Sequence, residues 1–216
     1  MRDAVEPKTV FRAAACAAVV ALVCALALGF VIQAPEPGLS LQPSMDIRSA
    51  ADFLRPSNQY PALALRFFAF DTLFVLSYVM VFVGLHATVA GRARTFATLG
   101  LGAGLAAGCF DALENAFFII YAQSALNGVS VTEPHLPLIY VVTNLKWMGA
   151  FAALAAFGLV WPRESRLGWV ISALMLLFPL LGALGVAAPE LVALRGLFFL
   201  VGMPLFAWHF WKRAQA

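Results

Sequence analysis

The sequence predicts an all-α membrane protein, a polytopic bundle of about six transmembrane helices. Three observations support this fold class. The 216 residues are 62% hydrophobic and 12% charged, whereas a soluble domain is about half apolar and about a quarter charged. Six segments are apolar over roughly 20 residues or more. Lys and Arg are concentrated in alternate connections between these segments.

The six segments are long enough to cross about 30 Å of hydrocarbon at about 1.5 Å of rise per residue. The predicted spans are about 10–32, 61–89, 95–122, 136–161, 167–186 and 191–211, within a single domain of residues 1–216. The apolar run of the first span, about 20 residues, is longer than the core of about 7–15 residues found in signal peptides. We therefore expect the first span to be an uncleaved helix.

The distribution of Lys and Arg predicts the orientation of the bundle. With the N-terminus inside, the cytoplasmic segments hold Arg2, Lys8, Arg12, Arg92, Arg94, Arg163, Arg166, Lys212 and Arg213. The outer loops hold Arg48 and Arg55 alone. Because short cytoplasmic loops are enriched in Lys and Arg, we expect a plasma (inner) membrane protein with both termini in the cytoplasm.

The longest connection, residues 33–60, is predicted to lie outside and to contain a short amphipathic helix. Ser44 is a suitable N-cap, Asp46 falls in the favourable first turn, and Pro56 is expected to stop the helix. Its apolar side comprises Met45, Ala50, Ala51, Phe53 and Leu54. Such a helix lies at the membrane interface, either as a simple connector or as a lid over the bundle.

Charged residues fall within or close to the predicted spans. They are Arg66, Asp71, Asp111, Glu114, Lys146 and Arg195, and they are accompanied by Asn115 and Asn144. The helix directions place all of them in the outer half of the bilayer. Unpaired, six such charges would cost on the order of 15–20 kcal/mol, which exceeds the usual net stability of a fold. Three acids balance three bases, so we expect mutual pairing or contact with water.

The predicted third span carries the densest group of polar residues. Asp111, Glu114 and Asn115 stand at positions i, i+3 and i+4 and so share one helix face. The glycines of segment 100–108 follow a GxxxGxxxG pattern, which lets a neighbouring helix approach closely. We therefore expect a central, tightly packed helix.

These polar residues are the candidates for a binding cavity that opens to the outer face. The candidate residues are Asp71, Asp111, Glu114, Asn115, Asn144, Lys146 and Arg195. The first hypothesis is a protein that binds or transports a small solute, a proton or a lipid headgroup. Two alternatives stay open. One is a structural or accessory subunit whose charges form an architectural ion-pair network. The other is a lipid-modifying enzyme that uses Asp111 and Glu114 as acid and base.

The sequence contains no motif for a cofactor or a metal. Cys16, Cys24 and Cys109 form no CxxC pair, lie in apolar runs and are expected to be buried small hydrophobes. The basic residues lie in short loops and form no patch interleaved with aromatic residues, so we expect no binding of nucleic acid. Membrane lipids are the expected partners, and the sequence leaves the oligomeric state open.

Overall fold

The protein is a bundle of long helices. The computed structural model describes residues 6–31, 35–36, 39–41, 49–187 and 194–216, and in these ranges it contains helices and no strand. The membrane-length helices are α1 (Pro7–Leu26, continued by the π-helical segment η1, Ala27–Val31), α3 (Pro61–Val89), α4 (Arg94–Leu126), α5 (Leu136–Val160), α6 (Arg166–Ala187) and α7 (Leu194–Gln215). The prediction of an all-α bundle with six spans is confirmed.

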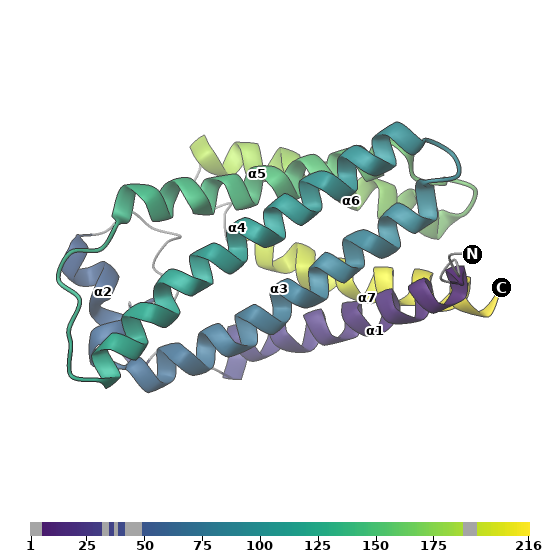
Figure 1. The fold of residues 1–216 in the computed structure, drawn as a ribbon. Helices are drawn as coiled ribbons and strands as arrows, with labels where there is room; N and C mark the ends of the chain where they lie inside the picture. Colours follow the sequence, from purple (N-terminus) through teal and green to yellow (C-terminus); the bar gives the residue numbers. More distant parts are fainter. Residues whose placement is uncertain (1–5, 32–34, 37–38, 42–48, 188–193) are drawn as a thin grey trace, which may run out of the picture.

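The long helices run along a common axis and alternate in direction (Figure 1). Both ends of the chain lie at one end of the bundle, which we call the terminal end, and the short helix α2 (Ala50–Gln59) lies at the other, the α2 end. Extensive packing follows the order α6, α5, α4, α3, α1, α7, and α7 also contacts α6. The six helices therefore form a closed ring.

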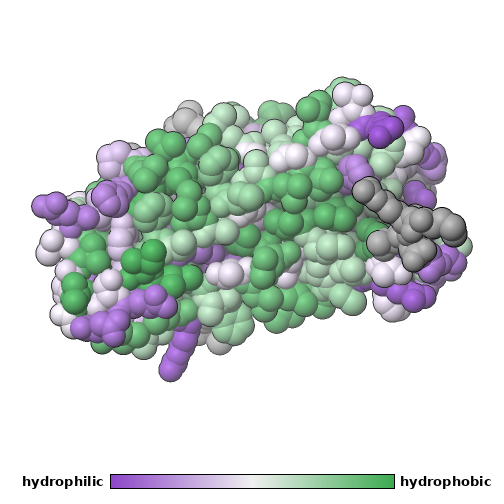
Figure 2. Space-filling model, viewed as in Figure 1, coloured by the Kyte–Doolittle hydropathy of each residue, from purple (hydrophilic) through white to green (hydrophobic). Residues whose placement is uncertain are grey.

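The outer surface of the ring is apolar. Figure 2 shows apolar side chains over the middle of the bundle and polar ones at its two ends. Leu76, Leu99 and Met148 keep 65%, 62% and 64% of their surface exposed, as expected of side chains that face lipid. The chain is thus a multi-pass membrane protein. Cys24 is buried, but Cys16 and Cys109 are exposed on this surface, contrary to the expectation for them.

The glycines of α4 let this helix pack closely against two neighbours. A Cβ added at Gly100 would lie 2.8 Å from the Phe157 ring of α5, and one added at Gly104 would lie 2.6 Å from the Phe82 ring of α3. No larger residue fits at either position unless the ring moves. The prediction of close packing at these glycines is confirmed, but α4 is one member of the ring and not a central helix.

The short outer helix begins later than expected. Ser44 and Asp46 lie outside the described residues, and the N-cap of α2 is Ser49, which accepts a hydrogen bond from the backbone N–H of Asp52 at 3.2 Å. Pro56 lies within α2 and does not stop it, because the carbonyl group left without a donor belongs to the exposed residue Asp52. The buried side of α2 consists of Phe53, Leu54, Pro56 and Ser57, whereas Ala51 is exposed.

Candidate intramembrane binding site

Lys146 of α5 joins two carboxylates of α4. Its ammonium nitrogen Nζ lies 2.9 Å from Oδ1 of Asp111 and also donates to Oε2 of Glu114. The Tyr78 hydroxyl of α3 donates to the other Asp111 oxygen at 2.9 Å. The Thr143 hydroxyl lies 2.9 Å from Oε1 of Glu114 and also contacts a backbone carbonyl of its own helix. These side chains form a buried hydrogen-bonded network, which we call the lysine network.

Helix geometry explains why these side chains meet. Asp111 and Glu114 are three residues apart on α4, as are Thr143 and Lys146 on α5, so each pair shares a helix face. One turn beyond Lys146, a Cβ added at Gly149 would lie 2.9 Å from a backbone oxygen of α4. The two helices are therefore close enough for the short contacts between Lys146 and the carboxylates.

Asp71 of α3 lies beside the lysine network and is incompletely satisfied. It is 6% exposed, interacts electrostatically with Asp111 and Lys146, and has Asn115 as its polar neighbour. Among the described residues, its oxygen Oδ2 has no hydrogen-bond partner, and neither has Oδ1 of Asn115. The amide nitrogen of Asn115 donates weakly to the Thr72 hydroxyl, at 3.5 Å. Two buried acceptor atoms are therefore left unused at this level of the bundle.

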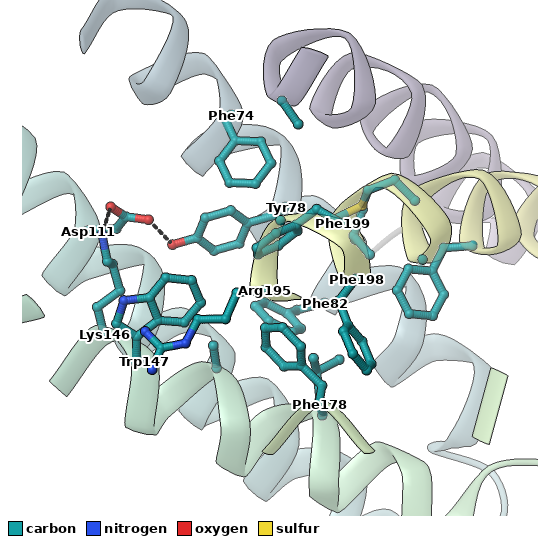
Figure 3. A pocket seen from close by; sticks show the side chains of 18 of the residues that line it. Phe74, Tyr78, Phe82, Asp111, Lys146, Trp147, Phe178, Arg195, Phe198 and Phe199 are labelled. Carbon is teal, nitrogen blue, oxygen red and sulfur yellow. Dashed lines mark hydrogen bonds and ion pairs between the residues drawn. The ribbon is translucent and has the colours of Figure 1, made fainter. Parts of the chain in front are cut away.

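A cavity of about 430 Å³ begins at this charged cluster and continues toward the terminal end. Asp71, Asp111, Lys146 and Arg195 line its charged part. Most of the remaining wall is apolar and rich in aromatic rings (Figure 3), including Phe74, Phe82, Phe178, Phe198 and Phe199. The cavity thus combines a charged end with an apolar body.

Arg195 enters the cavity from the first turn of α7. Its guanidinium group lies over the Trp147 ring, 4.5 Å from the ring centroid, beside the lysine network (Figure 3). Its nitrogen Nε has no hydrogen-bond partner, and among the described residues it forms no ion pair with a carboxylate. The indole nitrogen of Trp147 is likewise buried without a partner. Unused donors therefore face the same cavity as the unused acceptor of Asp71.

The structure brings most of the predicted candidates together. Asp71, Asp111, Glu114, Asn115 and Lys146 are buried side by side, and Arg195 reaches the same cavity. Asn144 does not join them, since its side chain is exposed and its amide donates to the Tyr140 carbonyl of its own helix at 2.8 Å. Asn144 is two positions before Lys146 on α5, a rotation of about 200°, so it points toward the opposite side of the helix.

The expected balance of charge is not found in the cluster. Arg66 is exposed on the outside of α3, because five residues of helix turn it well away from Asp71. Three acids, Asp71, Asp111 and Glu114, therefore remain with two bases, and one of these, Arg195, has no acidic partner.

Several contributors are neutral side chains that the sequence analysis did not select. Tyr78 and Thr143 complete the lysine network, and Trp147 supports Arg195. Their spacing gives a usable signal, because Tyr78 lies seven residues after Asp71 and Thr143 three before Lys146. A search for polar residues on the same helix face as each buried charge would have found both.

Comparison of the chain with protein-family models, curated proteins and solved structures gives no significant match. The observations that bear on function are therefore those of the cavity and its charged end.

Proposed function

We propose that the protein binds a small amphipathic molecule inside the membrane. Its polar group would lie between Asp71 and Arg195, and its apolar part would lie among the aromatic rings. The observation that carries this proposal is that one largely apolar cavity contains two oppositely charged side chains, each with one buried polar atom that lacks a partner among the described residues. Ligand sites usually combine an apolar wall with a few polar groups in this manner.

The lysine network does not supply what Asp71 and Arg195 lack. Lys146 is already shared by Asp111 and Glu114, and these three side chains together leave one negative charge. Ionised Asp71 adds a second. A buried charge without a partner is strongly unfavourable, so Asp71 either holds a proton or meets a cationic group. A zwitterionic ligand satisfies both groups, with its cation at Asp71 and its anion at Arg195.

The apolar wall favours an amphipathic ligand over the other ligands considered. A metal ion or a fully polar solute would lose its hydration shell in this cavity, and the phenylalanine side chains of the wall offer no oxygen ligands in return. A proton alone requires no cavity of about 430 Å³. A lipid headgroup attached to a hydrocarbon chain fits both the charged and the apolar parts of the wall.

The architectural alternative is supported by one specific observation, the closed lysine network. It accounts for Asp111, Glu114 and Lys146, but it leaves the unpaired atoms of Asp71 and Arg195 without a role. The enzyme hypothesis receives less support. Asp111 lines the cavity, whereas Glu114 is fully buried and does not, so an acid and a base would not reach one substrate together.

The proposal includes an orientation in the plasma (inner) membrane, with both chain termini in the cytoplasm. Basic side chains at the terminal end, such as Arg92, Arg163 and Lys212, support it through the positive-inside rule. The charged cluster, which lies in the half of the bundle nearer to α2, would then lie in the outer half of the bilayer.

The experiment uses purified protein in detergent and two single-chain lipids with the same acyl chain. Lysophosphatidylethanolamine is zwitterionic, whereas lysophosphatidic acid lacks the amine. Native mass spectrometry should show retention of the zwitterionic lipid by the wild type. Asp71→Asn and Arg195→Gln should each weaken binding at least about tenfold, because each removes a charged hydrogen bond worth about 1.5–3 kcal/mol.

Arg66→Gln serves as the matched control, since it removes an exposed arginine from α3 at the α2 end and should leave retention unchanged. Circular dichroism checks that each variant is folded. Retention that is identical in the wild type, Asp71→Asn and Arg195→Gln would reject the proposed site.

A further inference from the structure

We infer that the ligand enters the cavity sideways from the bilayer, through a portal between η1 and the first turn of α7, and that it is therefore a single-chain membrane lipid. This inference rests on the proposed function. Three observations support it: side chains pack closely at the α2 end, helices pack closely at the terminal end, and the side wall is exposed at two glycines that line the cavity.

At the α2 end, the described residues close the bundle over α3 and α4 by aromatic packing. Phe53 of α2 lies against Phe118 of α4, with ring centroids 5.4 Å apart, and Phe118 stacks on Phe68 of α3 at 4.8 Å. All three rings are almost completely buried, and none of them lines the cavity. Helix α2 thus forms a plug over the ends of α3 and α4, and its described residues form no part of the cavity wall.

The terminal end is closed by direct helix packing. Leu85 lines the cavity and is fully buried. Beside it, a Cβ added at Gly84 of α3 would lie 2.8 Å from the Phe210 ring of α7, and Phe210 is itself fully buried. Among the described residues, α1, α3 and α7 therefore meet closely beyond the end of the cavity, and a ligand has no route along the bundle axis there.

The side wall is open at two glycines that line the cavity. Gly29 of η1 and Gly196 of α7 are both exposed, and a Cβ added at either would meet no atom within 4 Å. Helix α1 packs extensively along α7, but η1 does not. Among the described residues, η1 and α7 thus share few contacts where these two glycines line one cavity, and we place the portal between them.

The side chains around the portal are apolar and exposed, which indicates that the ligand comes from the lipid bilayer. Leu26 and Leu197 lie beside the portal with 40% and 54% of their surface exposed, and such side chains face hydrocarbon in a membrane protein. Arg195 lines the same cavity from the same turn of α7 as Gly196, so a polar headgroup that passes the portal enters the part of the cavity that holds the guanidinium group. A water-soluble molecule that used this portal would first have to cross lipid.

The size of the cavity limits the ligand to one chain. A volume of about 430 Å³ lies toward the lower end of the roughly 300–1,000 Å³ that enclose drug-sized ligands. We therefore take one hydrocarbon chain, and not the two chains of a phospholipid, as the occupant of the apolar part of the cavity. Lysophosphatidylethanolamine is therefore a suitable probe.

The test measures the rate of uptake from a bilayer. Protein in phosphatidylcholine vesicles is mixed with phosphatidylcholine donor vesicles that contain lysophosphatidylethanolamine, and occupancy is followed over time by native mass spectrometry. Gly29→Trp and Gly196→Trp should slow uptake several-fold. Gly102→Trp is the matched control, because Gly102 is also exposed with open space at its Cβ but lies on α4 away from the cavity.

A second version of the test avoids any defect in folding. In a chain whose three native cysteines are replaced by serine, Gly196→Cys is folded first and then modified with a bulky maleimide. Uptake should slow after modification and not before it. Uptake at the wild-type rate in both the blocked and the tryptophan variants would overturn the portal while binding in detergent still upheld the proposed function. Absence of binding by the wild type in detergent would overturn both.

Discussion

At the scale of single residues, the buried charges fall into two groups that require different explanations. Lys146 has protein partners for its charge, and Asp111 and Glu114 each have a cation and a hydroxyl group. Asp71 and Arg195 have polar atoms without partners and line the cavity. The first group is expected to contribute to stability, and the second to binding.

Replacement of Lys146 by methionine should destabilise the protein by about 3–5 kcal/mol, because two buried carboxylates lose their cation. The triple variant Lys146→Met, Asp111→Asn, Glu114→Gln should recover much of this loss, since it removes the charges together. Unfolding in a detergent titration measures both effects. Lys212→Met, at an exposed lysine of α7, is the control. A Lys146→Met variant as stable as this control would show that the lysine network does not stabilise the fold.

Replacement of Tyr78 by phenylalanine should lower stability by about 1.5–3 kcal/mol, the usual value for a hydrogen bond to a charged group. The ring and its packing remain, so the effect reports the bond to Asp111. Ser77→Ala on the same helix should have a smaller effect, because the Ser77 hydroxyl bonds only to a carbonyl of its own helix. Thermal unfolding compares the two, and equal melting temperatures would count against a role for the Tyr78 bond.

The sequence was informative for charged residues and less so for their neutral partners. Asp111, Glu114 and Asn115 could be placed together because one helix carries them on one face. Asn144 and Arg66 were misplaced because depth in the membrane was considered without the direction around the helix. Lys146 pairs with two acids of α4 because α4 packs against α5, and local sequence does not specify this packing.

At the scale of elements, α2 is fixed to the bundle by a reciprocal pair of hydrogen bonds. The Asn58 side chain donates to the Val131 carbonyl at 3.0 Å and accepts from the Val131 N–H at 3.3 Å. These bonds join α2 to the connection between α4 and α5. Together with the buried Phe53, they hold the plug in place at the α2 end.

Asn58→Ala should loosen α2 without unfolding the spans. Hydrogen exchange of residues 50–59 should rise about tenfold, as expected if about 1.4 kcal/mol of local stability is lost. Gln59→Ala is the control, because among the described residues the Gln59 side chain hydrogen-bonds to the exposed Arg55 of the same helix. Exchange in 50–59 that matches the control would show that the Asn58 bonds do not hold α2.

The start of α2 illustrates why boundaries are hard to predict. Ser44 and Ser49 both satisfy the rule for an N-cap, but Ser49 is followed three residues later by Asp52, and the two residues bond to each other. Pro56 is tolerated because of the local exposure of Asp52. Both features depend on which face of the helix is buried.

At the scale of the whole molecule, hydropathy was sufficient for the class of fold and the number of spans. The boundaries were approximate, since α4 extends to Leu126, beyond the predicted end near residue 122. The ring order of the helices and the cavity inside it follow from packing between distant segments. Membrane helices are all apolar, so composition alone does not determine which of them become neighbours.

The proposed orientation can be tested with reporter fusions. Alkaline phosphatase, which is active only outside the cytoplasm, should be active when fused at Gly128, in the connection between α4 and α5, and inactive when fused after Gln215. The opposite pattern would place the charged cluster in the inner half of the bilayer. The reason for the expected result is the excess of Lys and Arg at the terminal end.

The central claim is that Asp71 and Arg195 together hold one zwitterionic polar group, and dissociation constants for the two matched lipids test it most directly. Asp71→Asn should weaken binding of lysophosphatidylethanolamine at least about tenfold and leave lysophosphatidic acid unaffected or bound more tightly. Arg195→Gln should weaken binding of both lipids. Failure of the wild type to bind either lipid, or an equal loss for both lipids in Asp71→Asn, would contradict the claim.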